Sequence, residues 1–364
     1  MPSVCALVLT RNRRELLLEC LGALERQTVP VERIVVVDNA SEPDTRAAVE
    51  GLGLGERLVY SRLERNVGSA GGYSHGVEIA RGLEGVDWIW IMDDDAEPPD
   101  DSLERLLAAV PEGSEPDAAS PGAAASQPPI AALASAVVVP GGEVDTLHRG
   151  FTGRFLRALP AEEYRAGNHV ELGFSSFTGL LVAARAARAE EPPRADFFIW
   201  ADDVEYTIRL RRHGRLVLVP EAVIVHKTRM GGRGNTLRGR LINRLFGVAY
   251  PSADWDTYWK NLHMFRNFAW IKREHFGAGG RELAVAAGAY VVKSLLYDSK
   301  PLRRIPWILW ASARGRSGEP LGMSPERWER IAREGLRPPG SAAAEPGSAA
   351  AEPGSAAAEP GSAA

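Results

Sequence analysis

Three consecutive carboxylates, Asp93, Asp94 and Asp95, directly follow the apolar run at residues 88–92. Carboxylates crowded at the end of a buried strand repel one another, so a divalent cation is the natural counter-charge. Asp93 and Asp95 project to the same side if the backbone is still extended there. Oxygen ligands of this kind suit Mg²⁺ or Mn²⁺ that holds a diphosphate. The alternative is an acidic loop that caps a following helix.

A second acidic cluster, with Asp202, Asp203 and Glu205, follows the aromatic segment at residues 197–200. A carboxylate here could act as a general base. The positive end of a helix dipole also favours acidic residues in a first turn, and both interpretations stay open. His226 directly follows the apolar run 217–225, just as the aspartate triplet follows the run 88–92. A single histidine is, however, more often structural.

Two further apolar runs are followed by polar residues or glycines. Asp38 comes after residues 33–37; taken alone, a turn with a helix cap explains it better than a contact with a base or ribose. Three glycines, Gly68, Gly71 and Gly72, precede a helix that we expect to begin near Tyr73. Such glycines let backbone N–H groups approach a phosphate. More often, glycine occupies a turn because a side chain would not fit there.

Strands and helices that alternate along the chain must position these residues. Strand-like apolar runs lie at residues 4–9, 33–37, 58–63 and 88–92, and segments with helical spacing lie at 14–27, 45–52 and 72–82. This order predicts an α/β fold with a parallel sheet, whose ligands bind beyond the carboxyl ends of the strands. The first strand is not followed by the G-x-G-x-x-G fingerprint, which argues against a dinucleotide-dependent dehydrogenase.

The composition of the 364 residues is that of an ordinary globular protein. Lys and Arg total 43 against 47 Asp and Glu, for a net charge of −4, so nothing indicates a nucleic-acid partner. The only two cysteines, Cys5 and Cys20, favour a reduced, cytoplasmic location. No signal peptide is apparent, and the longest apolar stretches, 283–292 and 305–313, are shorter than the ~20 residues of a membrane span.

We expect three regions. Residues 1–235 form the catalytic domain, with the Pro-rich segment 111–129 as a loop insertion. Residues 236–337 are helix-rich, and residues 338–364, built from a Gly-Ser-Ala-Ala-Ala-Glu-Pro repeat, form a disordered tail. Basic residues flank the Trp-containing stretch 305–313, which indicates either a peripheral contact with a membrane surface or an internally packed helix.

The motifs, taken in order, resemble the inverting GT-A glycosyltransferases of family 2, in particular the branch with bacterial galactofuranosyltransferases and rhamnosyltransferases. The resemblance rests on Thr10-Arg-Asn-Arg, Asp38-Asn-Ala-Ser, Asn66-x-Gly-x-Ala-Gly-Gly, Trp90-Ile-Met-Asp-Asp-Asp, Trp200-Ala-Asp-Asp-x-Glu-Tyr and Val225-His226. It implies the GT-A fold, a Rossmann-like and mostly parallel sheet flanked by helices.

The resemblance also implies how a nucleotide-sugar donor is held. Asp38 would contact the uracil or thymine, with Thr10 and Arg11 lining the same pocket. Asn66 and Gly68 would lie near the ribose and phosphates.

By the same resemblance, Asp93, Asp95 and His226 would hold Mn²⁺ or Mg²⁺, and Asp94 would lie near the donor sugar. Asp203 would be the catalytic base, with Asp202 as its neighbour. Thr178, Gly179 and Trp200 would lie on the acceptor side.

We therefore expect a metal-dependent inverting glycosyltransferase that moves galactofuranose or rhamnose from a UDP- or dTDP-sugar to a hydroxyl of a cell-wall, lipid-linked or polysaccharide acceptor. The Gln-x-x-Arg-Trp signature of processive synthases is missing, so one or a few sugars per acceptor are expected. The alternatives are a sugar-nucleotide pyrophosphorylase and a non-catalytic sugar-nucleotide or glycan-binding module. The oligomeric state is left open.

Overall fold

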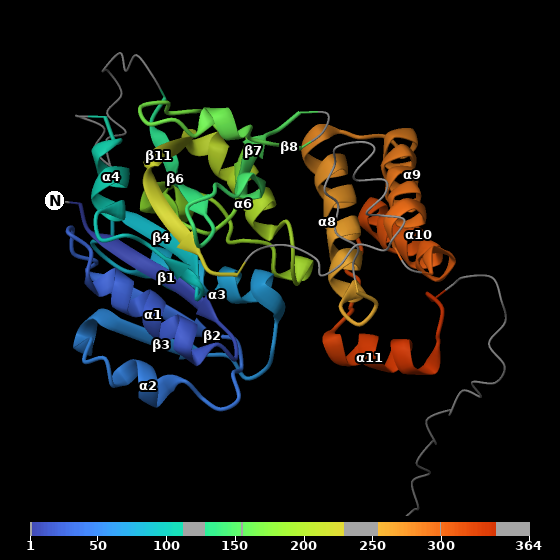
Figure 1. Ribbon diagram of the computed structural model, residues 1–364, viewed down its shortest axis with the longest axis horizontal. Coiled ribbons are helices and arrows are strands. Elements are labelled where there is room, and N and C mark those ends of the chain that lie inside the picture. Colours follow the sequence, from blue (N-terminus) through green and yellow to red (C-terminus); the bar gives the residue numbers. More distant parts are fainter. Residues whose placement is uncertain (1, 112–127, 154–155, 229–253, 299, 340–364) are drawn as a thin grey trace, which may run out of the picture.

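The buried apolar runs form one eight-stranded sheet in the order β3-β2-β1-β4-β10-β6-β11-β5. The computed structural model describes residues 2–111, 128–153, 156–228, 254–298 and 300–339 (Figure 1). The sheet strands are β1 (Val4–Thr10), β2 (Arg33–Asp38), β3 (Leu58–Arg62), β4 (Trp88–Asp93), β5 (Ala96–Glu97), β6 (Ile130–Val138), β10 (Leu180–Ala183) and β11 (Arg215–His226).

The first four strands run parallel, as the alternation of elements predicts. Every residue of β1 is buried, because β1 lies between β2 and β4 and helices pack against its faces. The crossover helices are α1 (Arg14–Glu25), α2 (Arg46–Glu50) and α3 (Gly68–Gly82). The carboxyl ends of these strands therefore meet at one edge of the sheet, where a ligand of a parallel sheet binds.

The expected start of α3 is wrong. The helix begins at Gly68 rather than near Tyr73, so Gly71 and Gly72 lie inside it and not in a loop before it. A Cβ on Gly72 would stand 2.4 Å from Leu9 Cδ1, and one on Gly76 would stand 2.5 Å from Leu7 Cδ1. These two glycines therefore let α3 pack closely against β1.

The second half of the sheet is mixed. β10 runs antiparallel to both β4 and β6, whereas β6 and β11 run parallel. The pairing of β11 with β6 shifts register between Val219 and Val223. This interval contains Pro220, which has no N–H to donate to a neighbouring strand. A small second sheet contains β7 (Arg149–Phe151), β8 (Arg157–Ala158) and β9 (Phe174–Ser175). The remaining helices of this part are α4 (Ser102–Ala108), α5 (Ala184–Ala189) and α6 (Asp202–Leu210).

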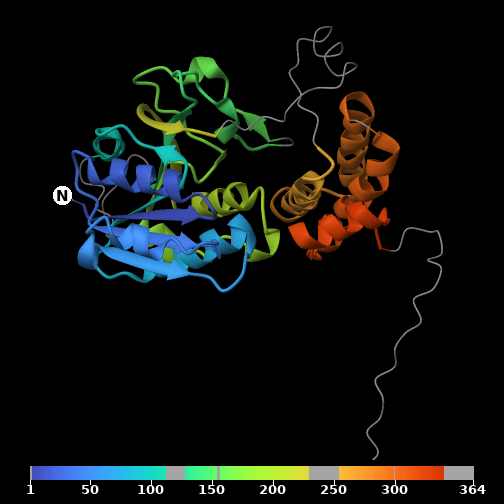
Figure 2. The same cartoon turned by 60° about the horizontal axis from the view of Figure 1, so that its bottom comes forward.

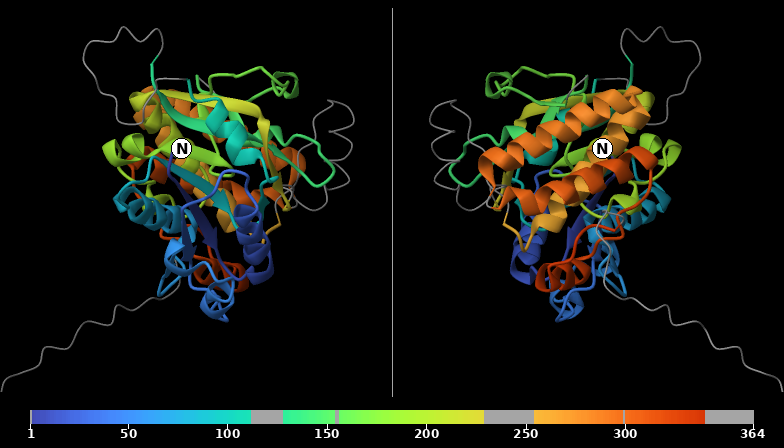
Figure 3. Two further views of the ribbon diagram at one scale, coloured as in Figure 1. Left: turned by 90° about the vertical axis from the view of Figure 1, so that its left-hand side faces the viewer. Right: turned by 90° about the vertical axis from the view of Figure 1, so that its right-hand side faces the viewer.

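The C-terminal region is helical, with α8 (Tyr258–Phe276), α9 (Gly280–Tyr297), α10 (Pro301–Ser317) and α11 (Pro325–Glu334). α8 lies nearest the α/β part, and α9 and α10 lie on its far side (Figures 1 and 2). From that side, α9 and α10 stand in front of the sheet (Figure 3). An aromatic core holds the helices together, with Trp307 and Trp328 fully buried and their ring centroids 5.3 Å apart.

The burial of Trp307 favours the internally packed helix over the membrane contact for residues 305–313. In the described part of the chain, no helix combines the length and the apolar character that crossing a membrane requires. The expected domain boundary at 235/236, most of the insertion at 111–129 and nearly all of the tail at 338–364 fall outside the described residues.

Candidate active site

The aspartate triplet and His226 come together where β4 and β11 end. Asp93 is the last residue of β4, and Asp94 and Asp95 form the turn into β5. β5 pairs with the end of β11 so that His226 lies opposite Ala96. One potential ligand atom from each of Asp93, Asp95 and His226 lies within 4.8 Å of the others.

Hydroxyl groups from two different elements orient Asp93. Its Oδ1 accepts a hydrogen bond of 2.6 Å from the Tyr73 hydroxyl on α3, and its Oδ2 accepts one of 2.7 Å from Thr178 Oγ1. Both donors are buried. The Asp93 carboxylate is therefore held in one orientation at the edge of the site.

The other two aspartates share Arg13. Its guanidinium lies 3.2 Å from Asp94 Oδ1 and 2.8 Å from Asp95 Oδ2, and Thr10 donates a hydrogen bond of 2.8 Å to Asp94. Burial raises the pKa of Asp94 to about 6. Burial also opposes ionisation of Asp95, but the contacts with His226, Thr228 and Arg13 together outweigh this effect and lower the pKa of Asp95 to about 2.

The residues of this cluster fit a divalent cation. Among the described residues, the buried atom His226 Nδ1 has no hydrogen-bond partner, and Asp95 Oδ1 has only its ion-pair contact with His226. His226 Nε2 lies 3.2 Å from Asp95 Oδ1. Two carboxylates and an imidazole form a mixed oxygen and nitrogen set that suits Mn²⁺ and also Mg²⁺. A histidine that binds metal must be neutral, so binding would displace its proton.

The second acidic cluster begins α6. Asp202 is buried, whereas Asp203 is half-buried and accepts a hydrogen bond of 2.7 Å from the Val204 N–H. Burial raises the pKa of Asp203 to about 6, and the charge of Asp93 adds to this shift. Glu205 is instead paired with Arg209 at 2.8 Å and with His275 at 3.1 Å, so its role is structural.

The segment before α6 approaches the loop that begins α3. A Cβ on Gly68 would stand 1.9 Å from the Phe198 carbonyl oxygen, and the φ of Gly68 is +77°. The Ala70 N–H donates a hydrogen bond of 3.1 Å to that oxygen. Only glycine fits at residue 68, because a side chain would be strained there and would also push the two loops apart.

Gly68→Ala is therefore expected to destabilise the protein by about 2–4 kcal/mol, the sum of left-handed backbone strain and overpacking. Chemical denaturation measures this change. Gly53→Ala is the matched control, because Gly53 has a φ of +72° but a Cβ added there would meet nothing within 4 Å. Equal destabilisation by the two substitutions would show that the close approach to Phe198 has no energetic weight.

The remaining predicted donor residues lie at the ends of β1, β2 and β3 or in the loops that follow. Asp38 is fully buried and accepts hydrogen bonds from the Ser41 N–H, Thr45 and Tyr60 at 2.7–2.8 Å. It orders the loop after β2, which agrees with the turn interpretation, and its contact with a donor stays a prediction. Arg11 is exposed, and Asn66 Oδ1 accepts hydrogen bonds from Asn39 and the Gly68 N–H, both at 3.0 Å.

On the predicted acceptor side, Thr178 touches the site directly through Asp93. Gly179 is a packing residue, because a Cβ there would stand 2.4 Å from Ile224 Cγ1 and its φ is +71°. Trp200 is 37% exposed, so its indole is open to solvent two residues before Asp202. Its contact with an acceptor stays a prediction.

Sequence reasoning missed three residues of this site: Arg13, Tyr73 and Arg149. Arg149 is fully buried and donates to the carbonyl oxygens of Ser135 and Thr178 at 3.0 and 2.6 Å. Burial lowers its pKa to about 10. Arg13 lies two residues after Arg11 in the sequence and could have been predicted as part of the site. Nothing local to Tyr73 or Arg149 indicates that either approaches the aspartates.

Comparisons with known proteins show the family and the fold of the chain. Residues 5–121 match the family model described as Glycosyl transferase family 2. The galactofuranosyltransferase GlfT1 of Mycolicibacterium smegmatis is 33% identical over 214 residues, which are 58% of this chain and 66% of that protein. GlfT1 of Mycobacterium tuberculosis strain H37Rv is 31% identical over 215 residues, with the same two coverages.

A solved structure shows the same fold. The crystal structure of GalNAc-T7 with UDP, GalNAc and Mn²⁺ superposes with a TM-score of 0.51 at 15% identity, covering 75% of this chain and 51% of that one. The fold is thus that of the GT-A glycosyltransferases. The chain belongs to glycosyltransferase family 2, which confirms the family and the fold class that the motifs indicate. It spans 66% of the length of these curated relatives.

Proposed function

We infer that the protein transfers galactofuranose from UDP-galactofuranose to a hydroxyl of a glycan acceptor, with inversion at the anomeric carbon. The observation that carries this proposal is a cluster of two carboxylates and an imidazole together with a separate carboxylate, Asp203, whose pKa is raised to about 6 by burial and by the charge of Asp93. The curated relatives named above are galactofuranosyltransferases, which supports this donor over dTDP-rhamnose.

In the proposed reaction, Asp203 accepts the proton of the acceptor hydroxyl while that oxygen forms a bond to the anomeric carbon. The bond from the anomeric carbon to the diphosphate breaks, and UDP leaves. A divalent cation held by Asp93, Asp95 and His226 would supply the positive charge that stabilises this leaving group. Direct attack with a single base inverts the anomeric centre.

Calorimetric titration tests the donor site. UDP is expected to bind with a stoichiometry of about one in the presence of Mn²⁺ and much more weakly in EDTA. A transfer assay then compares UDP-galactofuranose with dTDP-rhamnose. Tighter Mn²⁺-dependent binding of dTDP than of UDP, with transfer of rhamnose, would replace the proposed donor, and binding of neither nucleotide would favour the non-catalytic module.

The transfer rate is expected to fall about tenfold per pH unit below about pH 6 and to level off above pH 7. Burial raises the pKa of Asp203 to about 6, so below this pH the carboxyl group is protonated and cannot accept a proton. The kcat measured from pH 5 to 8 tests this, with UDP affinity over the same range as a control for loss of metal. A kcat that does not change from pH 5 to 7 would contradict the assignment.

A further inference from the structure

We propose that Asn267 of α8 is a positioning residue that holds the segment 197–201 in the conformation that places Asp203, so that the C-terminal helices form part of the catalytic apparatus. This inference rests on the proposed function, because it assigns a means of orienting the proposed base.

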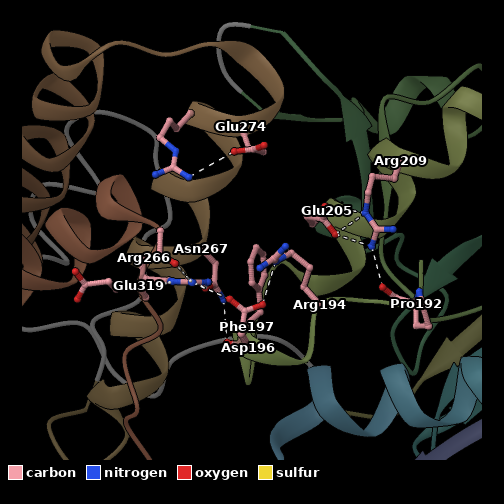
Figure 4. A network of polar contacts seen from close by, with 12 residues as sticks. Pro192, Arg194, Asp196, Phe197, Glu205, Arg209, Arg266, Asn267, Glu274 and Glu319 are labelled. Carbon is pink, nitrogen blue, oxygen red and sulfur yellow. Dashed lines mark hydrogen bonds and ion pairs between the residues drawn. The ribbon is translucent and has the colours of Figure 1, made fainter. Parts of the chain in front are cut away.

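The contact is made by a single buried amide. Asn267 is fully buried, and its Nδ2 atom lies 3.0, 3.1 and 2.8 Å from the carbonyl oxygens of Phe197, Ile199 and Trp200. Figure 4 shows Asn267 and Arg266 on α8 pointing toward Phe197 and Asp196. One side chain from the helical region thus bonds to three peptide groups of the segment 197–201.

The segment needs such an external restraint. Phe198, Trp200 and Ala201 have φ values of 61°, 71° and 66°. These values lie in the left-handed region, which residues other than glycine rarely adopt. Such a backbone persists only where the surroundings over-determine it. Ala201 directly precedes α6, and the Glu205 N–H donates a hydrogen bond of 2.9 Å to its carbonyl oxygen. The backbone at residues 200–201 therefore sets the direction in which Asp202 and Asp203 leave the loop.

Neighbouring contacts hold the same segment against α8. Arg266 is fully buried and pairs with Asp196 at 2.8 Å. The ring of His263 stacks on Phe198 with centroids 5.2 Å apart. Phe198 in turn accepts the hydrogen bond from Ala70 at the start of α3. The segment is thus held between α8 and the start of α3 at Gly68.

Asn267→Asp keeps the size of the side chain but replaces the donor amide with an acceptor facing three carbonyl oxygens. We expect kcat for transfer to fall roughly ten- to a hundredfold, because small displacements of a reacting group have effects of this size. The Kd of UDP with Mn²⁺ should stay within about threefold of the wild-type value and the stoichiometry near one, since the metal cluster is not touched. Hydrogen exchange should become faster in peptides covering residues 194–204 and stay unchanged in those covering β1.

Ser324→Ala is the matched control. Ser324 caps α11 by accepting a hydrogen bond of 3.2 Å from the Arg327 N–H, so its loss weakens the helical region without touching the segment 197–201. Its kcat should stay within about twofold of wild type. A smaller folded fraction lowers the stoichiometry of UDP binding, whereas a misplaced base lowers kcat and leaves the stoichiometry near one.

A kcat for Asn267→Asp within about twofold of wild type, or an equal loss in Ser324→Ala, would overturn the inference. If Asn267→Asp does not fold, Asn267→Ala is judged by the same criteria. A wild-type protein that transfers no sugar would refute the proposed function instead, and hydrogen exchange at residues 194–204 would still decide whether Asn267 holds the segment.

Discussion

Asp203→Asn is expected to lower kcat for sugar transfer by roughly 10²–10⁴-fold, the usual contribution of a general base. The carboxamide has nearly the shape of the carboxylate but cannot take up the proton of the acceptor hydroxyl. Asp203 is not among the three potential metal ligands, so binding of UDP with Mn²⁺ should be retained. Steady-state kinetics and calorimetry on the same preparation measure both quantities.

Asp202→Asn provides the comparison for this variant. Asp202 is 4% exposed, and burial raises its pKa well above the ordinary value. Burial opposes ionisation of Asp202 and hides it from an acceptor, whereas Asp203 is half-buried, so Asp202→Asn should retain more activity than Asp203→Asn. If Asp202→Asn abolishes transfer and Asp203→Asn leaves kcat unchanged, the base is Asp202 and the assignment from exposure is wrong.

Asp95→Asn is expected to lower kcat/KM by about 10³-fold, because a bound metal ion contributes several kcal/mol through charge stabilisation of the leaving group. Asp95 lies between Arg13 and His226, at 2.8 and 3.2 Å, and its replacement removes one of two carboxylates from the cluster. Mn²⁺-dependent binding of UDP should weaken in parallel, which calorimetry measures directly.

Asp94→Asn is the matched control, since it is the same substitution at the adjacent residue. Asp94 is bonded to Thr10 and Arg13 and is not one of the three potential ligands. Burial raises the pKa of Asp94 to about 6, so replacing its carboxylate with a neutral amide disturbs the site less than the same change at Asp95. Mn²⁺-dependent UDP binding should therefore persist in Asp94→Asn. Full transfer activity of the wild-type protein in excess EDTA would refute the metal site.

The first half of the sheet was predictable because its pattern is local. Fully buried parallel strands such as β1 and β4 consist of continuous apolar runs, and the helices between them show apolar spacing of their own. The start of α3 was not predictable, because Gly68, Gly71 and Gly72 weaken the helical pattern at its beginning, and the reason for glycine at residues 72 and 76 lies on another element. That reason is the space needed for Leu9 and Leu7 on β1.

Neighbouring residues encode the two acidic clusters, the order of strands and helices in the first half of the sheet, and the family to which the chain belongs, so these could be predicted from the sequence. Which side chains meet became known from the folded structure alone. Tyr73 and Thr178 reach Asp93 across 20 and 85 residues of chain, and Asn267 reaches Phe197 across 70. Such contacts depend on how whole elements pack, and local periodicity carries no information about them.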